Sequence, residues 1–351
     1  MSVILRYDNI KTVVTPLNPI EDVVSWIRGL NSLGYTSDLL KNIHGISDPK
    51  EIKKCGQLIS TYAENAIGFL DQAYSGSPKV SFLPLYYAIL NISKIYVVLS
   101  GKRMQLPKNP WHGAKYDPLK KTSRDLLTEE ITLKEQGILP LFYESLTNLP
   151  WKLQNRKIKL YDIYPYIHDI SYEYEHAYKR PFALQGIRLT IKKESSGGYN
   201  LVAELKQSDH PNAGKQQYLR ILKGFHSNPQ QPNVFISHKV FAATEKEAHD
   251  LLLKNVKRYL LYGTMTDSLG QIEGSWTILS NKRLLFPEEI PIWIAFFHLS
   301  NVVRYNPEFL ARIKDSKSWS MVLALRKHAI LKFLLLFWSY LHQSQIVVRP
   351  G

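Results

Sequence analysis

The sequence predicts an α+β protein that is mainly α, with a helical body formed by its N- and C-terminal sections and an inserted β-containing middle segment. Two observations predict this class: capped, apolar helix patterns occupy both ends of the chain, whereas apolar residues alternate with polar ones only in the middle. We expect an N-terminal helical section over residues 1–150, a middle section with strands and one helix over 151–284, and a C-terminal helical section over 285–351 that packs on the first.

Helix signals are clear in the first section. Asn18-Pro19-Ile20-Glu21 and Asp48-Pro49-Lys50-Glu51 each combine a capping side chain, a proline suited to the first turn and an acid at the third position. After the second start, apolar residues follow a helical period up to Ser75-Gly76-Ser77-Pro78. The stretch 82–99 is apolar nearly all round, which predicts a central helix. We expect only helices up to about residue 150.

The middle section changes to a period of two. Alternation around Ser195-Ser196-Gly197-Gly198 predicts a hairpin, and 233–240 and 274–279 predict further strands. A capping box at Thr244-Glu245-Lys246-Glu247 predicts a helix to about Tyr262. The final section, 287–342, is again helical, with a fresh start at Asn306-Pro307-Glu308.

Composition predicts a cytoplasmic location. Cys55 is the single cysteine, so the chain can form neither an internal disulfide nor a cysteine-rich zinc site. The first residues, MSVILRYDNIK, lack the pattern of a secretory signal. The apolar stretches 82–101, 290–303 and 329–341 are too short or too interrupted for membrane spans, so we expect buried helices and no integral membrane insertion.

The chain is strongly basic, with 45 Lys and Arg against 30 Asp and Glu and a net charge of +15. Such a charge attracts nucleic acid, acidic proteins and anionic lipid surfaces. Residues 102–124 hold seven basic residues against one acid, Asp117, which predicts either a contact loop or a solvated one. The candidate partner-binding residues are Lys102, Arg103, Lys108, Lys115, Lys120, Lys121, Arg124, Lys179, Arg180, Arg326 and Lys327.

Two stretches carry a family resemblance. Leu85-Tyr86-Tyr87-Ala88-Ile89-Leu90-Asn91-Ile92-Ser93-Lys94, followed by a basic loop and Trp111-His112-Gly113, resembles the YaaC-like family, as does Leu299-Ser300-Asn301-Val302-Val303-Arg304-Tyr305-Asn306-Pro307. The resemblance covers about residues 60–150 and 285–345. It implies a helical, cytoplasmic bacterial protein, and the family has no settled activity to transfer.

Both stretches contain a residue suited to phosphate chemistry. If the two central helices pack together, His112 and Arg304 come close and form a phosphate-binding or catalytic pair. Alternatively, both side chains hold loops in place by bonding to backbone carbonyls. HEPN-type ribonucleases carry Arg and His four to six residues apart; Arg220 and His226 have that spacing, but Gly224 between them disfavours a helix, so the match is attributed to chance.

A His and carboxylate cluster, His168, Asp169, Glu173, Glu175 and His176, lacks any metal-binding spacing, and no nucleotide-binding or hydrolase motif is present. We therefore expect no metal and no cofactor. Tyrosines alternating with acids over 171–178 predict an exposed strand or interface. Lys179 and Arg180 could then hold a nucleic-acid backbone.

These observations lead to three functional hypotheses. The first is a non-enzymatic scaffold or adaptor that binds nucleic acid or an acidic protein through a basic face, within an antiphage defence complex suggested by the resemblance and the charge. The alternative is a metal-independent, HEPN-like ribonuclease that uses His112 with Arg304, or Arg220 with His226. Peripheral attachment to anionic lipid is a third, weaker hypothesis.

Overall fold

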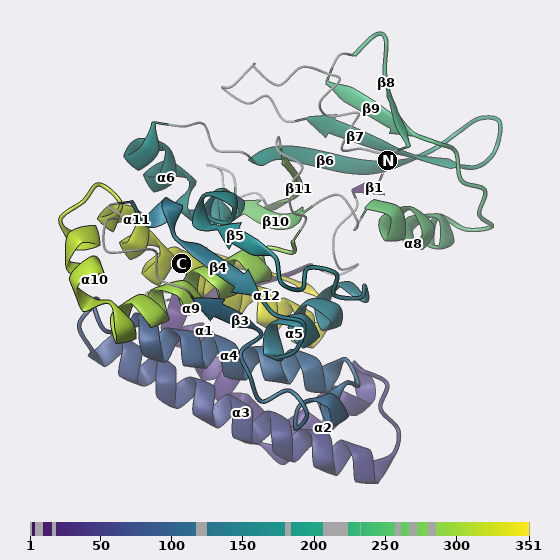
Figure 1. Ribbon diagram of the computed structural model, residues 1–351. Helices are drawn as coiled ribbons and strands as arrows, with labels where there is room; N and C mark the ends of the chain where they lie inside the picture. Colours follow the sequence, from purple (N-terminus) through teal and green to yellow (C-terminus); the bar gives the residue numbers. More distant parts are fainter. Residues whose placement is uncertain are drawn as a thin grey trace. The chain divides into compact units, whose positions relative to one another are not determined.

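The computed structural model describes residues 2–3, 10–15, 19–116, 125–179, 184–205, 224–231, 233–256, 261–266, 272–279 and 286–350. The chain divides into two compact units (Figure 1). One comprises residues 1–10 and 181–288, and the other comprises 11–180 and 289–351. The α+β, mainly α class is confirmed, because sections near both ends of the chain form the helical body and the middle of the chain supplies most of the large sheet.

The helical body is built from ten α-helices among the described residues. They are α1 (Pro19–Arg28), α2 (Leu33–Asn42), α3 (Pro49–Ser75), α4 (Phe82–Leu99), α5 (Ile138–Thr147), α6 (Ser171–Tyr178), α9 (Glu289–Tyr305), α10 (Pro307–Lys314), α11 (Trp319–Ala324) and α12 (Ile330–His342). A π-helical turn, Leu325–Ala329, joins α11 to α12. Short 3-10 turns lie at Gly29–Asn31, Arg103–Gln105, Leu126–Thr128, Leu160–Asp162, Tyr164–Tyr166 and His168–Ile170.

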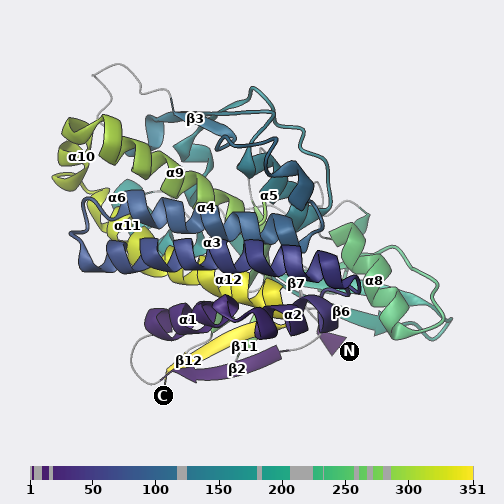
Figure 2. The ribbon, with the colours of Figure 1, turned by 90° about the horizontal axis from the view of Figure 1, so that it is seen from below.

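Helix α3 begins and ends where the sequence predicts. The Lys50 amide donates to the Asp48 side chain over 3.0 Å, which satisfies one free donor of the first turn. Residues at helical spacing, including Cys55, Ile59, Ala66 and Leu70, are buried. This face packs along α4, and Figure 2 shows the two helices side by side.

Helices α4 and α9 form the centre of the helical body. Nearly every residue of α4 is buried, as are residues 289–300 of α9. The rings of Phe82 and Phe296 lie 5.9 Å apart, and Tyr86 meets Trp293 edge to face at 5.3 Å. Each such aromatic side chain contributes about 1.5–3 kcal/mol through burial. These contacts join the N-terminal section to the C-terminal one.

Among the described helices, α4 is the one long and apolar enough to span a bilayer by length and composition. In this structure 78% of this apolar stretch is buried inside the protein. It therefore serves as a core helix of the body described above.

The other unit contains a seven-stranded sheet, in which the described pairings are antiparallel. Its strands are β1 (Ser2–Val3), β6 (Leu184–Lys193), β7 (Tyr199–Leu205), β8 (Phe225–Ser227), β9 (Val234–Ser237), β10 (Leu261–Thr266) and β11 (Ile272–Leu279). The order is β10-β11-β6-β7-β9-β8, and β1 also pairs with β6. The predicted hairpin is confirmed, because β6 and β7 pair with Lys193 opposite Tyr199 and both glycines of the turn have positive φ.

Helix α8 (Glu245–Val256) starts at the predicted capping box. It ends earlier than predicted, because Leu261 and Tyr262 belong to strand β10 and pair with β11. The apolar residues of 261–266 form a strand because a partner strand supplies their backbone hydrogen bonds, which a local pattern cannot reveal.

The sequence interpretation was wrong in two places within the helical body. Residues 171–178 form helix α6 rather than a strand, since Tyr174 and Ala177 bury one face at helical spacing while Tyr172 stays 76% exposed. Strands also occur where only helices were expected: β3 (Ala114–Tyr116) and β4 (Glu130–Leu133) form a small sheet with β5 (Lys157–Lys159), which lies in the section where strands were expected. In addition, β2 (Ile10–Thr15) pairs with β12 (Gln345–Pro350). β3 and β4, with three and four residues, are too short to show a period of two.

The segment that carries His112 is fixed on the start of α5. The amides of Ile138 and Leu139 donate to the carbonyls of Trp111 and His112 over 2.9 and 3.0 Å. Gly137, with φ +131°, lies so close that a Cβ atom there would stand 2.3 Å from the Gly113 amide nitrogen. Two glycines, Gly113 and Gly137, make this close approach of the two segments possible.

We expect Gly137→Ala to lower the free energy of unfolding by about 3 kcal/mol, because the new Cβ overlaps the backbone and the φ, ψ pair suits glycine alone. Chemical denaturation monitored by circular dichroism measures this. Gly68→Ala is the matched control, since Gly68 lies in α3 with open space around it and should gain about 0.5–1 kcal/mol from helix propensity. Equal effects of the two substitutions would contradict the packing of 111–113 on α5.

Candidate functional site

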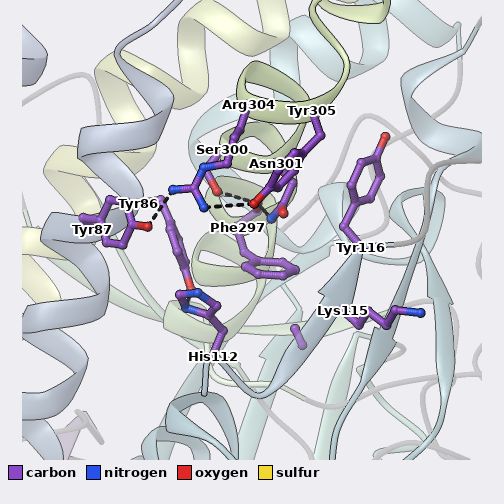
Figure 3. A pocket seen from close by; sticks show the side chains of 11 residues that line it. Tyr86, Tyr87, His112, Lys115, Tyr116, Phe297, Ser300, Asn301, Arg304 and Tyr305 are labelled. Atoms are coloured by element: carbon purple, nitrogen blue, oxygen red, sulfur yellow. Dashed lines mark hydrogen bonds between the residues drawn. The ribbon is translucent and has the colours of Figure 1, made fainter. Parts of the chain in front are cut away.

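A surface pocket of about 190 Å³ lies in the helical body, where the first turns of α4 and the last turns of α9 meet the segment around His112 (Figure 3). Its described lining comes from α4, from residues 112–116 and from the last turns of α9. The lining residues are Tyr86, Tyr87, His112, Ala114, Lys115, Tyr116, Phe297, Ser300, Asn301, Arg304 and Tyr305. None of these residues carries a carboxylate.

Helix α9 presents residues at helical spacing to the pocket. Phe297, Asn301 and Arg304 are spaced at i, i+4 and i+7, which places them on one face. Phe297 is buried against the core, whereas Arg304 in the last turn is exposed. The same helix thus contributes to the core and then to the pocket.

Arg304 is held between two tyrosines. Its Nη2 donates to the Tyr87 hydroxyl over 2.6 Å and its Nη1 donates to the Tyr305 hydroxyl over 3.2 Å. The guanidinium carbon also lies 5.7 Å and 5.5 Å from the two ring centroids. In the described part of the chain no carboxylate pairs with Arg304, and three of its five N–H groups remain for a ligand. The hydrogen bonds to the Tyr305 and Tyr87 hydroxyls raise the pKa of Arg304, so it stays charged.

His112 is positioned by Tyr86. The Tyr86 hydroxyl lies 2.7 Å from His112 Nδ1 (Figure 3), and Tyr86 is almost fully buried, with a pKa raised well above its ordinary value by burial. Because His112 Nδ1 is the acceptor that the described residues offer to the Tyr86 proton, we infer that Tyr86 donates to Nδ1. The neutral imidazole therefore carries its proton on Nε2, which acts as a donor.

The pKa of His112 is lowered by burial and, to a smaller extent, by the positive charges of Arg304 and Lys94. His112 is therefore neutral at physiological pH. His112 and Arg304, which the sequence predicted to come close, line the same pocket.

A buried polar network lies behind the pocket wall. The Tyr116 hydroxyl donates to Glu129 Oε2 over 2.6 Å, and Nε2 of the fully buried His298 lies 3.9 Å from the same oxygen. Burial lowers the pKa of His298, so its ring is neutral. Glu129 is itself 1% exposed, which keeps its carboxylate out of the pocket.

Several of the predicted partner-binding residues make internal contacts. Lys102 pairs with Glu144 at 3.0 Å, and Arg103 forms a two-pronged pair with Glu51. Arg326 donates to the Ser81 hydroxyl over 2.9 Å and to the Ala73 carbonyl over 3.3 Å. These bonds join the π-helical turn before α12 to the end of α3 and the start of α4. These three cations therefore stabilise the fold itself.

The other predicted basic residues are exposed or lie outside the described residues. Lys108, Lys115, Lys179 and Lys327 are exposed, and Lys115 also lines the pocket. Lys120, Lys121, Arg124 and Arg180 lie outside the described residues, as does Arg220 of the chance Arg–His spacing. His226 is described and lies in strand β8, in the sheet-containing unit.

Neither a metal site nor a reactive thiol is found among the described residues. Within those ranges no group of three or more His, Cys, Asp and Glu residues is arranged to hold a metal ion. Cys55 is buried, and burial raises the pKa of its thiol to about 11, so it stays protonated.

Sequence reasoning missed several lining residues that stand beside the ones it selected. Tyr86, Tyr87, Asn301 and Tyr305 lie within the two stretches quoted for the family resemblance. The helical spacing of Asn301 and Arg304 was a signal that could have found Asn301. Tyr116 gave no such signal, because it lies on β3, a strand of three residues.

The fold and the pocket define a class: an α+β protein whose helical body carries a donor-rich surface pocket between its two central helices. The family model described as "YaaC-like Protein" matches residues 29–341. The chain therefore belongs to the YaaC-like protein family, as the resemblance of the two stretches suggested. Neither the curated proteins nor the solved structures contain a match to this chain.

We expect His112 to titrate below 6.5 in the folded protein, and Arg304→Gln to raise this pKa without restoring it fully, since burial is the larger cause. Histidine side-chain NMR over a pH series measures both values. Arg312→Gln is the matched control, because Arg312 is also exposed but lies on α10 over Phe309.

The same lowered pKa fixes the sign of the effect on stability. As the pH falls below about 6.5, the unfolded chain binds a proton at His112 before the folded chain does, so stability falls with the pH in that window. A His112 pKa at or above 6.5, or one that Arg304→Gln leaves unchanged, would show that the charge of Arg304 does not reach the ring.

Proposed function

We propose that this protein is a non-enzymatic adaptor that binds nucleic acid, with one backbone phosphate held in the pocket by Arg304 and His112. The observation that carries the proposal is the exposed guanidinium of Arg304, which has tyrosine hydroxyls but no carboxylate as its described partners. A cation positioned in this way is ready for an anionic ligand.

The rest of the pocket also favours an anion. His112 offers an Nε2–H donor without a charge of its own, and no described lining residue carries a carboxylate that would repel a phosphate. The two tyrosine hydroxyls that accept from Arg304 each retain a proton to donate. Planar guanidinium groups match the oxygens of a phosphate in particular.

The net charge of +15 supports a polyanionic partner over a single small anion. An acidic protein is the competing partner, and the experiment below separates the two. We further propose that the protein acts in the bacterial cytoplasm within an antiphage defence complex. Identification of the proteins and nucleic acids that co-purify with the native chain tests this part.

The geometry of His112 favours binding over RNA cleavage. A general base must accept a proton from the ribose hydroxyl, which would require an unprotonated Nε2. That tautomer would place the proton on Nδ1 and leave the buried hydroxyl proton of Tyr86 without its described acceptor, a loss of about 1–3 kcal/mol. The ribonuclease hypothesis therefore takes second place.

We expect a labelled single-stranded RNA or DNA to bind at low salt, with affinity that falls as salt is added. Arg304→Gln should weaken binding about ten- to a hundredfold, because hydrogen bonds to a charged group are lost. Fluorescence anisotropy across a salt series measures this, with Arg312→Gln as the control that removes one exposed positive charge elsewhere.

No binding at low salt, or equal loss in the two variants, would overturn the phosphate site. Displacement by polyglutamate as effective as by unlabelled nucleic acid would favour an acidic protein partner instead. Reversal of Lys120, Lys121 and Arg124 to Glu should lower the affinity and the salt dependence if the basic loop adds phosphate contacts.

We expect RNA to remain intact when incubated with the protein in EDTA, because the Nε2 proton prevents His112 from acting as a base. Gel analysis of labelled RNA after prolonged incubation measures this, with His112→Ala and Arg304→Gln prepared alongside. Cleavage that persists in EDTA and is lost in His112→Ala would contradict the adaptor proposal and restore the ribonuclease.

A further inference from the structure

The pocket carries features that a phosphate alone would not use. Tyr305 is 64% exposed at the rim of the pocket. Arg304 lies over one face of this ring, with its guanidinium carbon 5.5 Å from the centroid, and no other ring or cation among the described residues lies over the opposite face. An exposed aromatic ring beside a fixed cation is a suitable surface for stacking a planar group.

Asn301 adds a polar group that recognises uncharged ligands. Its Nδ2 donates to the Phe297 carbonyl over 2.7 Å, which fixes the orientation of the amide. The side-chain oxygen has no partner among the described residues, so the pocket presents an amide acceptor beside its several donors. A ligand with both an anionic part and N–H groups uses both kinds of partner.

The size of the pocket limits what enters it. A volume of about 190 Å³ is below the roughly 300–1,000 Å³ of pockets that enclose drug-sized molecules. A fragment of a polymer, such as one nucleotide, is of the right scale, with its neighbours lying outside. In a duplex each base is stacked on both sides and paired, so a nucleotide would have to leave the helix at a cost of a few kcal/mol.

We infer that the pocket binds an unpaired nucleotide of single-stranded nucleic acid, with a phosphate on Arg304 and the base stacked on the open face of Tyr305. The inference rests on the proposed function and adds the form of nucleic acid that is recognised. The guanidinium donates hydrogen bonds to the hydroxyls of Tyr87 and Tyr305. These bonds hold the phosphate-binding group and the stacking ring in a fixed arrangement.

Three DNA probes of equal length test the inference: a single strand, the matched duplex, and a single strand of abasic sugar phosphates. We expect the wild-type protein to bind the single strand about tenfold or more tightly than either of the others, since stacking contributes about 1–3 kcal/mol per base. This comparison needs no variant and therefore does not depend on the folding of one.

Substitutions at Tyr305 then assign the effect to the ring. Tyr305→Leu should weaken single-strand binding about five- to a hundredfold, whereas Tyr305→Phe, which loses the same hydroxyl contact to Arg304 but keeps the ring, should retain most of the affinity. Tyr172→Leu is the matched control, because Tyr172 is 76% exposed on α6 and does not line the pocket.

The outcomes separate this inference from the proposed function. Equal binding of all three probes, with Arg304→Gln still weakening each, would overturn base stacking while leaving the phosphate site intact. Tighter binding of the duplex, or equal losses in Tyr305→Leu and Tyr172→Leu, would also overturn it. Absence of binding to any probe would overturn the proposed function itself.

Discussion

The packing of α4 against α9 is the constraint on which the helical body depends. Each helix is too apolar to face water, and each supplies the other with ring-to-ring contacts, such as Tyr86 with Trp293 and Phe82 with Phe296. The two helices are separated by about two hundred residues of sequence, so the chain must bring its ends together to bury them. Of the residues between them, 181–288 belong with residues 1–10 to the separate sheet-containing unit.

The pocket is a consequence of the same packing. Tyr86 takes part in both, since its ring contacts Trp293 in the core while its hydroxyl bonds to His112 at the pocket. The core beside it excludes water, which lowers the pKa of His112 and strengthens the interactions of nearby charges. Arg304 lies in the last turn of α9, where the helix leaves the core. Its backbone is therefore held by the helix, while its charged group reaches solvent.

The structure separates cations that the sequence could only count. Lys102, Arg103 and Arg326 were grouped with the candidate contact residues, yet each bonds to a group inside the protein. Arg304 differs because its described partners are hydroxyls, which fix its position without cancelling its charge. Whether a basic residue is neutralised depends on carboxylates distant in sequence, such as Glu51 and Glu144, so no local pattern could separate these roles.

The sequence by itself determined the helices with strong caps and long apolar periods, such as α3 and α4, and the hairpin around Gly197 and Gly198, because those signals arise from neighbouring residues. It also suggested that His112 and Arg304 would meet. Only the tertiary structure decided that residues 171–178 are helical, that Tyr116 lies on a strand of three residues, and that Tyr87, Asn301 and Tyr305 complete the pocket. These features depend on contacts between segments far apart in the chain, which are set by burial and by backbone pairing rather than by local propensity.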